Sequence, residues 1–149
     1  MITSRIQKEL APVVVIIAML GTTLFASGHD ALNRTAFDQD EAQLIGNWAG
    51  DSICQVKNSA CRDEKVVYHI AKGSDADNVT ISADKIVDGK AINMGTGDYT
   101  YDRKNGTLIN ESEGRVWKFT VKGKAMEGTL TMPDKTVYRR VTLKKEESR

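Results

Sequence analysis

From about residue 44 to residue 145 the chain alternates apolar and polar residues in short runs, and turn-forming residues separate the runs. A period of two places successive side chains on opposite faces of a β-strand, so each run predicts a half-buried strand. The predicted strands cover residues 44–54, 65–72, 78–87, 90–101, 107–110, 115–121, 126–132 and 136–144. No long helical period separates these runs, so neighbouring strands are expected to pair antiparallel.

Two of the predicted turns carry strong hairpin signals. Asp88-Gly89 and Asn105-Gly106 are residue pairs that accept the positive φ angles of tight turns. Eight strands in succession predict an all-β fold, an up-and-down antiparallel β-barrel whose closure removes exposed sheet edges. A seven-stranded or partly open barrel is the alternative, because the strand at 107–110 is short and Gly95 and Gly97 can bend or bulge the strand before it.

The N-terminal residues have the layout of an export signal. Arg5 and Lys8 precede an apolar run over residues 12–26, and small residues follow up to Gly28. We expect a signal peptide over residues 1–28, cleaved after Gly28, and a secreted or periplasmic product without stable membrane insertion. A retained anchor is the alternative, although the run falls short of the roughly 20 apolar residues of a spanning helix.

The rest of the chain is expected to form one domain. Residues 29–43 are mostly polar and predict a flexible lead-in with at most one helical turn, residues 44–145 predict the barrel, and residues 146–149 predict a frayed tail. Loss of residues 1–28 reduces the chain's 21 basic and 20 acidic residues to 19 of each. A neutral, well-mixed surface disfavours binding to nucleic acid or to an anionic membrane.

Cys54 and Cys61 are the two cysteines of the chain. In an exported protein an even number of cysteines is most simply a disulfide, here one that joins the first strand to the approach of the second. Zinc fits this pair poorly, because the cysteines stand six residues apart without a nearby histidine. We therefore expect a structural disulfide and no metal.

Candidate functional residues follow from the expected inward faces. Tyr68, Met126 and Gly128 are predicted to line the barrel interior and to contact a ligand, whereas His69 should point to solvent. Either a filled core or an open pocket fits this pattern. No carboxylate pair and no nucleophile with a histidine base is readable, so we expect no enzyme activity and no cofactor.

Gly46-Asn47-Trp48 on the first strand, with Arg139 on the last, resembles the Gly-x-Trp motif and C-terminal arginine of the calycins, the lipocalin and avidin-like barrels. The resemblance implies a lipocalin-like barrel in which Trp48 plugs the closed end and Arg139 lies across its ring as a structural anchor. It covers the region from residue 44 to 144 as architecture and two anchor positions. Bacterial periplasmic protease inhibitors, with an export signal, a Gly-x-Trp barrel and an early disulfide, resemble this plan too.

Three functions fit these expectations. The leading hypothesis is a monomeric exported barrel that binds a small apolar or amphipathic molecule in its mouth. The second is a secreted or periplasmic inhibitor of an envelope hydrolase, of protease or lysozyme type, that uses residues 29–43 or the barrel loops. The third is a structural envelope protein without a ligand.

Overall fold

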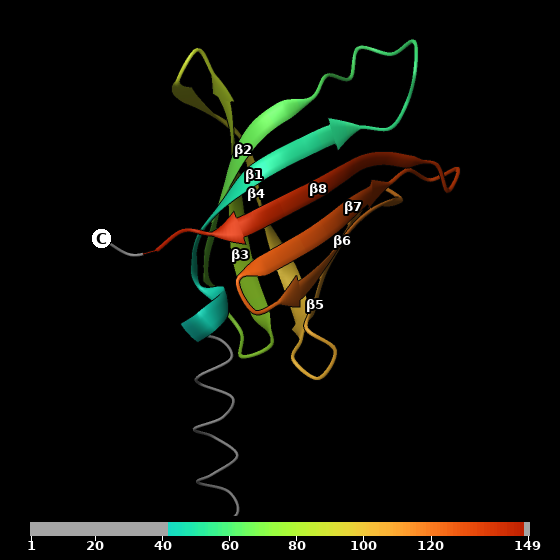
Figure 1. Cartoon of the computed structure of the whole chain (residues 1–149). Helices are drawn as coiled ribbons and strands as arrows, with labels where there is room; N and C mark the ends of the chain where they lie inside the picture. The colour runs from blue at the N-terminus through green and yellow to red at the C-terminus, as the bar shows by residue number, and fades with distance from the viewer. Residues whose placement is uncertain (1–41, 148–149) are drawn as a thin grey trace, which may run out of the picture.

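The computed structural model describes residues 42–147, and the predicted signal peptide, its cleavage site, most of the lead-in and the last two residues of the tail lie outside this range. The described strands are β1 (Gly46–Cys54), β2 (Glu64–Lys72), β3 (Asn78–Val87), β4 (Lys90–Asp102), β5 (Thr107–Ser112), β6 (Arg115–Lys122), β7 (Ala125–Thr131) and β8 (Val137–Lys145). They form a closed antiparallel barrel in sequence order, in which β8 returns to pair with β1 (Figure 1). The predicted all-β barrel is confirmed.

Tight turns join most of the strands. At the β3–β4 turn Asp88 and Gly89 have φ angles of 50° and 74°, the positive values that the sequence predicts there. Gly95 has a φ angle of 136°, and the register of β4 against β3 shifts at Ala83 and Asp84, which leaves Met94 unpaired as a bulge. This irregularity confirms the expected bend in β4. No helix of residues 42–147 is both long and apolar enough to cross a lipid bilayer.

One end of the barrel is closed by a helical turn over residues 42–44. Leu44 and Trp48 are buried there, and the indole Nε1 of Trp48 donates a hydrogen bond of 2.8 Å to the carbonyl oxygen of Leu44. Lys145 Nζ lies 6.0 Å from the centre of the Trp48 ring and donates to the carbonyl oxygens of Ala42 and Gln43. The turn therefore plugs this end, because backbone and side-chain hydrogen bonds hold it over the indole.

The expectation that Arg139 lies across Trp48 is wrong. In the ladder between β1 and β8, Trp48 pairs with Lys145 and Arg139 pairs with Cys54. Six residues of β1 separate the two pairs, which places them about 20 Å apart at the usual rise per strand residue. Lys145 occupies the position that the sequence interpretation gave to Arg139, because the register between β1 and β8 places it there.

The closed half of the barrel is filled. Its fully buried side chains include Met126 on β7 and Leu143 on β8, which are opposite each other in the ladder. Phe119 on β6 is fully buried farther along and stacks on Trp117, with ring centres 5.5 Å apart and planes 7° apart. The interior is therefore core at the end of Trp48, and only the opposite end is left to hold a ligand.

Candidate ligand-binding site

A cavity of about 400 Å³ lies at the open end of the barrel. Tyr68 from β2, Tyr99 from β4 and Trp117 from β6 supply its aromatic walls, and Ser52 from β1 lies at its polar side. All eight strands point toward this volume with alternate residues, so the inward positions near the open ends of several strands meet there. Because the aromatic residues come from separate strands, the closure of the barrel is what brings them together.

The polar side of the cavity is a network centred on Arg139. Its Nη1 donates a hydrogen bond of 3.0 Å to Ser52 Oγ and lies 3.0 Å from Glu64 Oε2. The side chains of Arg139 and Glu64 are 14% and 19% exposed, so this ion pair is largely removed from water. Lys85 Nζ lies 3.9 Å from the other oxygen of Glu64. The network places both signs of charge, already paired, beside the aromatic walls.

The two tyrosines bring hydroxyl groups to the cavity. Burial is the main reason that the pKa of Tyr68 is raised, and the charges of Tyr99 and Glu64 raise it further while Arg139 lowers it. Burial raises the pKa of Tyr99 to about 12. Both side chains therefore remain protonated at neutral pH, and neither hydroxyl has a hydrogen-bond partner among residues 42–147. Each is able to donate to or accept from a bound molecule.

The cavity also opens sideways between β4 and β5. These strands pair only from Thr100 to Asp102, and beyond that point they diverge. Asn110 on β5 spans the gap, because its Nδ2 donates a hydrogen bond of 2.8 Å to the carbonyl oxygen of Asp98. Gly95 and Gly97 line the cavity on this side and have no side chains to close it.

Of the residues predicted to bind a ligand, Tyr68 lines the cavity and the other two do not. Met126 is fully buried in the filled half of the barrel. Gly128 faces the ring of Phe119, and a Cβ atom at residue 128 would lie 2.2 Å from Phe119 Cδ1. The glycine therefore makes room for the phenylalanine of the core, and the expectation that Gly128 and Met126 contact a ligand is wrong.

Arg139, Glu64, Tyr99 and Trp117 are cavity residues that the sequence analysis did not assign to the site. Alternation along β4 and β6 was enough to predict that Tyr99 and Trp117 face inward. The pairing of Glu64 with Arg139 had no local signal, because β2 and β8 are adjacent only through β1. Sequence periodicity gives the face of a residue but not its height in the barrel.

His69 lies on the outer surface, as the alternation of β2 predicts. Its Nδ1 is 2.8 Å from Asn47 Oδ1, and its Nε2 is 3.0 Å from Asp84 Oδ2. Asn93 Nδ2 donates to the other oxygen of Asp84, and this bond together with that of His69 lowers the pKa of Asp84. The contacts form a ladder across β1 to β4 that holds the strands in register. In the described part of the chain no group of three histidine, cysteine or acidic side chains is placed to bind a metal ion.

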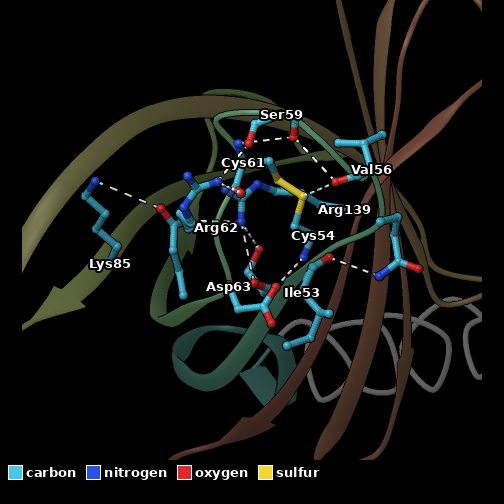
Figure 2. Close-up of polar contacts among 12 residues, drawn as sticks. Ile53, Cys54, Val56, Ser59, Cys61, Arg62, Asp63, Lys85 and Arg139 are labelled. Atoms are coloured by element: carbon cyan, nitrogen blue, oxygen red, sulfur yellow. Dashed lines mark hydrogen bonds and ion pairs between the residues drawn. A yellow bond between two sulfur atoms is a disulfide. The ribbon is translucent and has the colours of Figure 1, made fainter.

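The Cys54–Cys61 disulfide is present, with Cα atoms 5.9 Å apart, and closes the β1–β2 loop at the open end (Figure 2). Asp63 Oδ1 accepts a hydrogen bond of 2.8 Å from the backbone N–H of Cys54. Arg62 Nη1 donates to the carbonyl oxygens of Ser59 and Cys61, at 2.7 Å each. The loop is therefore tied internally on both sides of the disulfide and presents a fixed shape beside the cavity.

Comparisons with known proteins found no family model that matches this sequence and no match among curated proteins.

Proposed function

We propose that the protein binds a small amphipathic molecule in the cavity at its open end. The observation that carries the proposal is a cavity of about 400 Å³ that joins three aromatic side chains to a largely buried, hydrogen-bonded ion pair. Ligand pockets in proteins commonly measure about 300–1,000 Å³ and combine apolar walls with a few oriented polar groups. The cavity has both properties.

The arrangement of the walls favours one orientation of the ligand. Trp117 and Leu130 offer apolar surface on the β6–β7 side, while Ser52, Glu64 and Arg139 lie on the β1–β2–β8 side. An apolar group packs against the first side, and a hydrogen-bonding group reaches the Tyr68 hydroxyl and the Arg139 network on the second. Hydrogen bonds to charged groups contribute about 1.5–3 kcal/mol, so the polar side selects among molecules of similar shape.

We also propose that the chain is an exported calycin-like barrel. The closed eight-stranded antiparallel topology and the buried Trp48 are compatible with that superfamily. Lys145 supplies the cation above the indole. The signal-like residues 1–28 and the disulfide support a location in the periplasm or outside the cell. The barrel of a calycin is a ligand container, which agrees with the proposed use of the cavity.

Filling the cavity from Gly97 tests the proposed function. A Cβ atom at residue 97 makes only ordinary contacts, at 3.6 Å to Asn110 Nδ2 and 3.8 Å to Tyr99, so a larger side chain there extends into the cavity without a clash at its base. The probe is anilinonaphthalene sulfonate, an amphipathic aromatic anion whose fluorescence rises in apolar sites. We expect saturable binding to the wild type and a loss of about tenfold or more in Gly97→Phe.

The matched control is Thr100→Phe, which adds the same ring to the exposed outer face of the same strand. Binding equal to wild type is expected for this variant. Unsaturable fluorescence with the wild type, or equal binding by wild type and Gly97→Phe, refutes a ligand site in this cavity.

Inhibition of a hydrolase is the second candidate function, and the disulfide-closed loop favours it. Lys57 is exposed in that loop and Asn58 has a φ angle of 55°, so the internal contacts around the disulfide hold a pointed, rigid surface toward solvent. Rigid exposed loops bind hydrolases well because little conformational freedom is lost. The test compares wild type, Lys57→Ala and a chain lacking residues 29–41 against a trypsin-type protease and a lysozyme. Activity of both enzymes unchanged by the wild type excludes inhibition of these two types.

A further inference from the structure

The hairpin formed by the outer parts of β3 and β4 has a free edge. We call residues 84–94 the β3–β4 arm. In Figure 1 it projects beyond the other strands at the upper left. Only Thr100 to Asp102 of β4 pair with β5, so the stretch from Lys90 to Tyr99 has a strand neighbour on the β3 side alone. Unpaired strand edges are templates for pairing with another chain.

Exposed apolar side chains gather on the same arm. Among the described residues four large hydrophobic side chains are exposed, and three of them are Val87 at 42%, Ile92 at 44% and Met94 at 43%. Val87 is opposite Lys90 and Ile92 is opposite Lys85, so alternation places Val87 and Ile92 on one face of the arm. A free edge beside an apolar face is a surface that a further strand can cover.

The register of the arm determines which backbone groups are free. A two-residue turn makes Val87 and Lys90 a hydrogen-bonded pair, so Lys90 and Ile92 direct their N–H and C=O groups toward β3. Ala91 and Asn93 therefore direct theirs away from β3, to the unpaired edge. Two such edges, run antiparallel, match each other when Ile92 lies on the two-fold axis, because Ala91 of each copy is then opposite Asn93 of the other.

The side chains also match in this register. Ile92 meets Ile92 of the second copy as a non-hydrogen-bonded pair, the kind in which facing side chains are closest. Lys90 is opposite Met94 of the second copy, so no two like charges face each other. The same two patches meet in both directions, as a symmetric dimer requires.

We propose that two copies of this chain associate through the edges of their β3–β4 arms, with Ile92 at the two-fold axis, and form one sheet that continues from barrel to barrel. This departs from the monomer expected from the sequence. The edge lies on the arm outside the walls of the cavity, so the dimer is independent of the proposed ligand.

A disulfide across the two-fold axis tests the proposed geometry. Cys54 and Cys61 are bonded to each other, so Ile92→Cys adds a single free thiol. The full chain is expressed with its leader, purified after export, oxidised mildly and examined on non-reducing gels. We expect rapid, nearly complete dimer formation, because Cα atoms of such a pair lie about 4.5 Å apart.

The control is Val87→Cys, on the same face of the same arm with nearly equal exposure but away from the axis, and it should remain monomeric on the gel. Sedimentation of the wild type should show a dimer at high concentration, and Ile92→Lys should abolish it. A wild type that sediments as a monomer at its highest soluble concentration overturns the proposal. Equal cross-linking of the two cysteine variants overturns the register.

Discussion

Lys145 Nζ lies 6.0 Å from the centre of the Trp48 ring and donates to the carbonyl oxygens of Ala42 and Gln43. One ammonium group thus joins the last strand, the indole of the first strand and the helical turn that covers the end of the barrel. Burial, followed by the neighbouring charge of Lys124, lowers the pKa of Lys145. Its contacts with the ring and the carbonyls act against that cost.

Replacing Lys145 is expected to loosen the closed end. Lys145→Ala removes a cation above an aromatic ring and two hydrogen bonds to backbone carbonyls, and we expect a loss of about 1–2 kcal/mol in the free energy of unfolding. Lys144→Ala is the matched control, because Lys144 is exposed on the same strand. Urea unfolding followed by far-ultraviolet circular dichroism measures both. Equal stability of the two variants contradicts the role of Lys145.

Gly128 is expected to tolerate no side chain. Gly128→Ala places a Cβ atom 2.2 Å from Phe119 Cδ1, and we expect a loss of about 1–3 kcal/mol because the ring must shift within the core. Gly97→Ala meets only ordinary contacts and should change stability by less than about 0.5 kcal/mol. Thermal unfolding measures both variants.

Relief by a smaller neighbour separates this clash from other effects of the substitution. In a Phe119→Leu background, Gly128→Ala should cost less than it does in the wild type, since the atoms that crowd the new Cβ are gone. Equal cost in the two backgrounds contradicts the contact as the cause.

Breaking the Arg139–Glu64 pair is expected to destabilise the open end more than removing both charges. Arg139→Met leaves the 19% exposed Glu64 carboxylate with the more distant Lys85, at a cost of about 2–3 kcal/mol. Arg139→Met combined with Glu64→Met should cost less than Arg139→Met alone, because no charge is left unpaired. Denaturant unfolding of the two single variants and the double variant measures the coupling. Strictly additive costs contradict a direct interaction.

Stability is expected to fall at high pH because of the buried tyrosines. The pKa of Tyr99 is about 12 when folded and near 10 when unfolded, so the unfolded chain loses its phenolic proton first. The contribution of Tyr99 is therefore complete below pH 10 and is lost as the pH rises toward 12.

The measurement is the free energy of unfolding of wild type and Tyr99→Phe from pH 9 to pH 12. The difference between them should change by up to about 1.4 kcal/mol per pH unit over that window, in the direction that favours the variant at high pH. A constant difference shows that the Tyr99 hydroxyl titrates as an exposed phenol.

The strands could be predicted from the sequence because the information that defines them is local. Alternation and turn chemistry place the boundaries within two residues of those observed, and the Asp88-Gly89 turn has the positive φ angles expected of it. The disulfide between Cys54 and Cys61 was predictable for the same reason, because the loop that it closes is short.

The height of each residue in the barrel could not be predicted, because it depends on pairing between distant strands. Arg139 and Lys145 both occupy inward positions of β8, and only the register against β1 decides which of them reaches Trp48. Gly128 was expected to leave space, but Phe119 from the neighbouring strand fills that space. The cavity itself depends on the divergence of β4 and β5 after three residue pairs, which no local pattern encodes.

The two indole N–H groups give the most direct test of ligand binding in the open end. Trp117 lines the cavity, whereas Trp48 is fully buried beneath the helical turn at the other end. Two-dimensional NMR of the nitrogen-15 labelled protein, titrated with anilinonaphthalene sulfonate, follows both signals separately. The predicted result is a saturable shift of the Trp117 signal with the Trp48 signal unmoved. A Trp117 signal that stays in place, or equal movement of both signals, contradicts a ligand site at the open end.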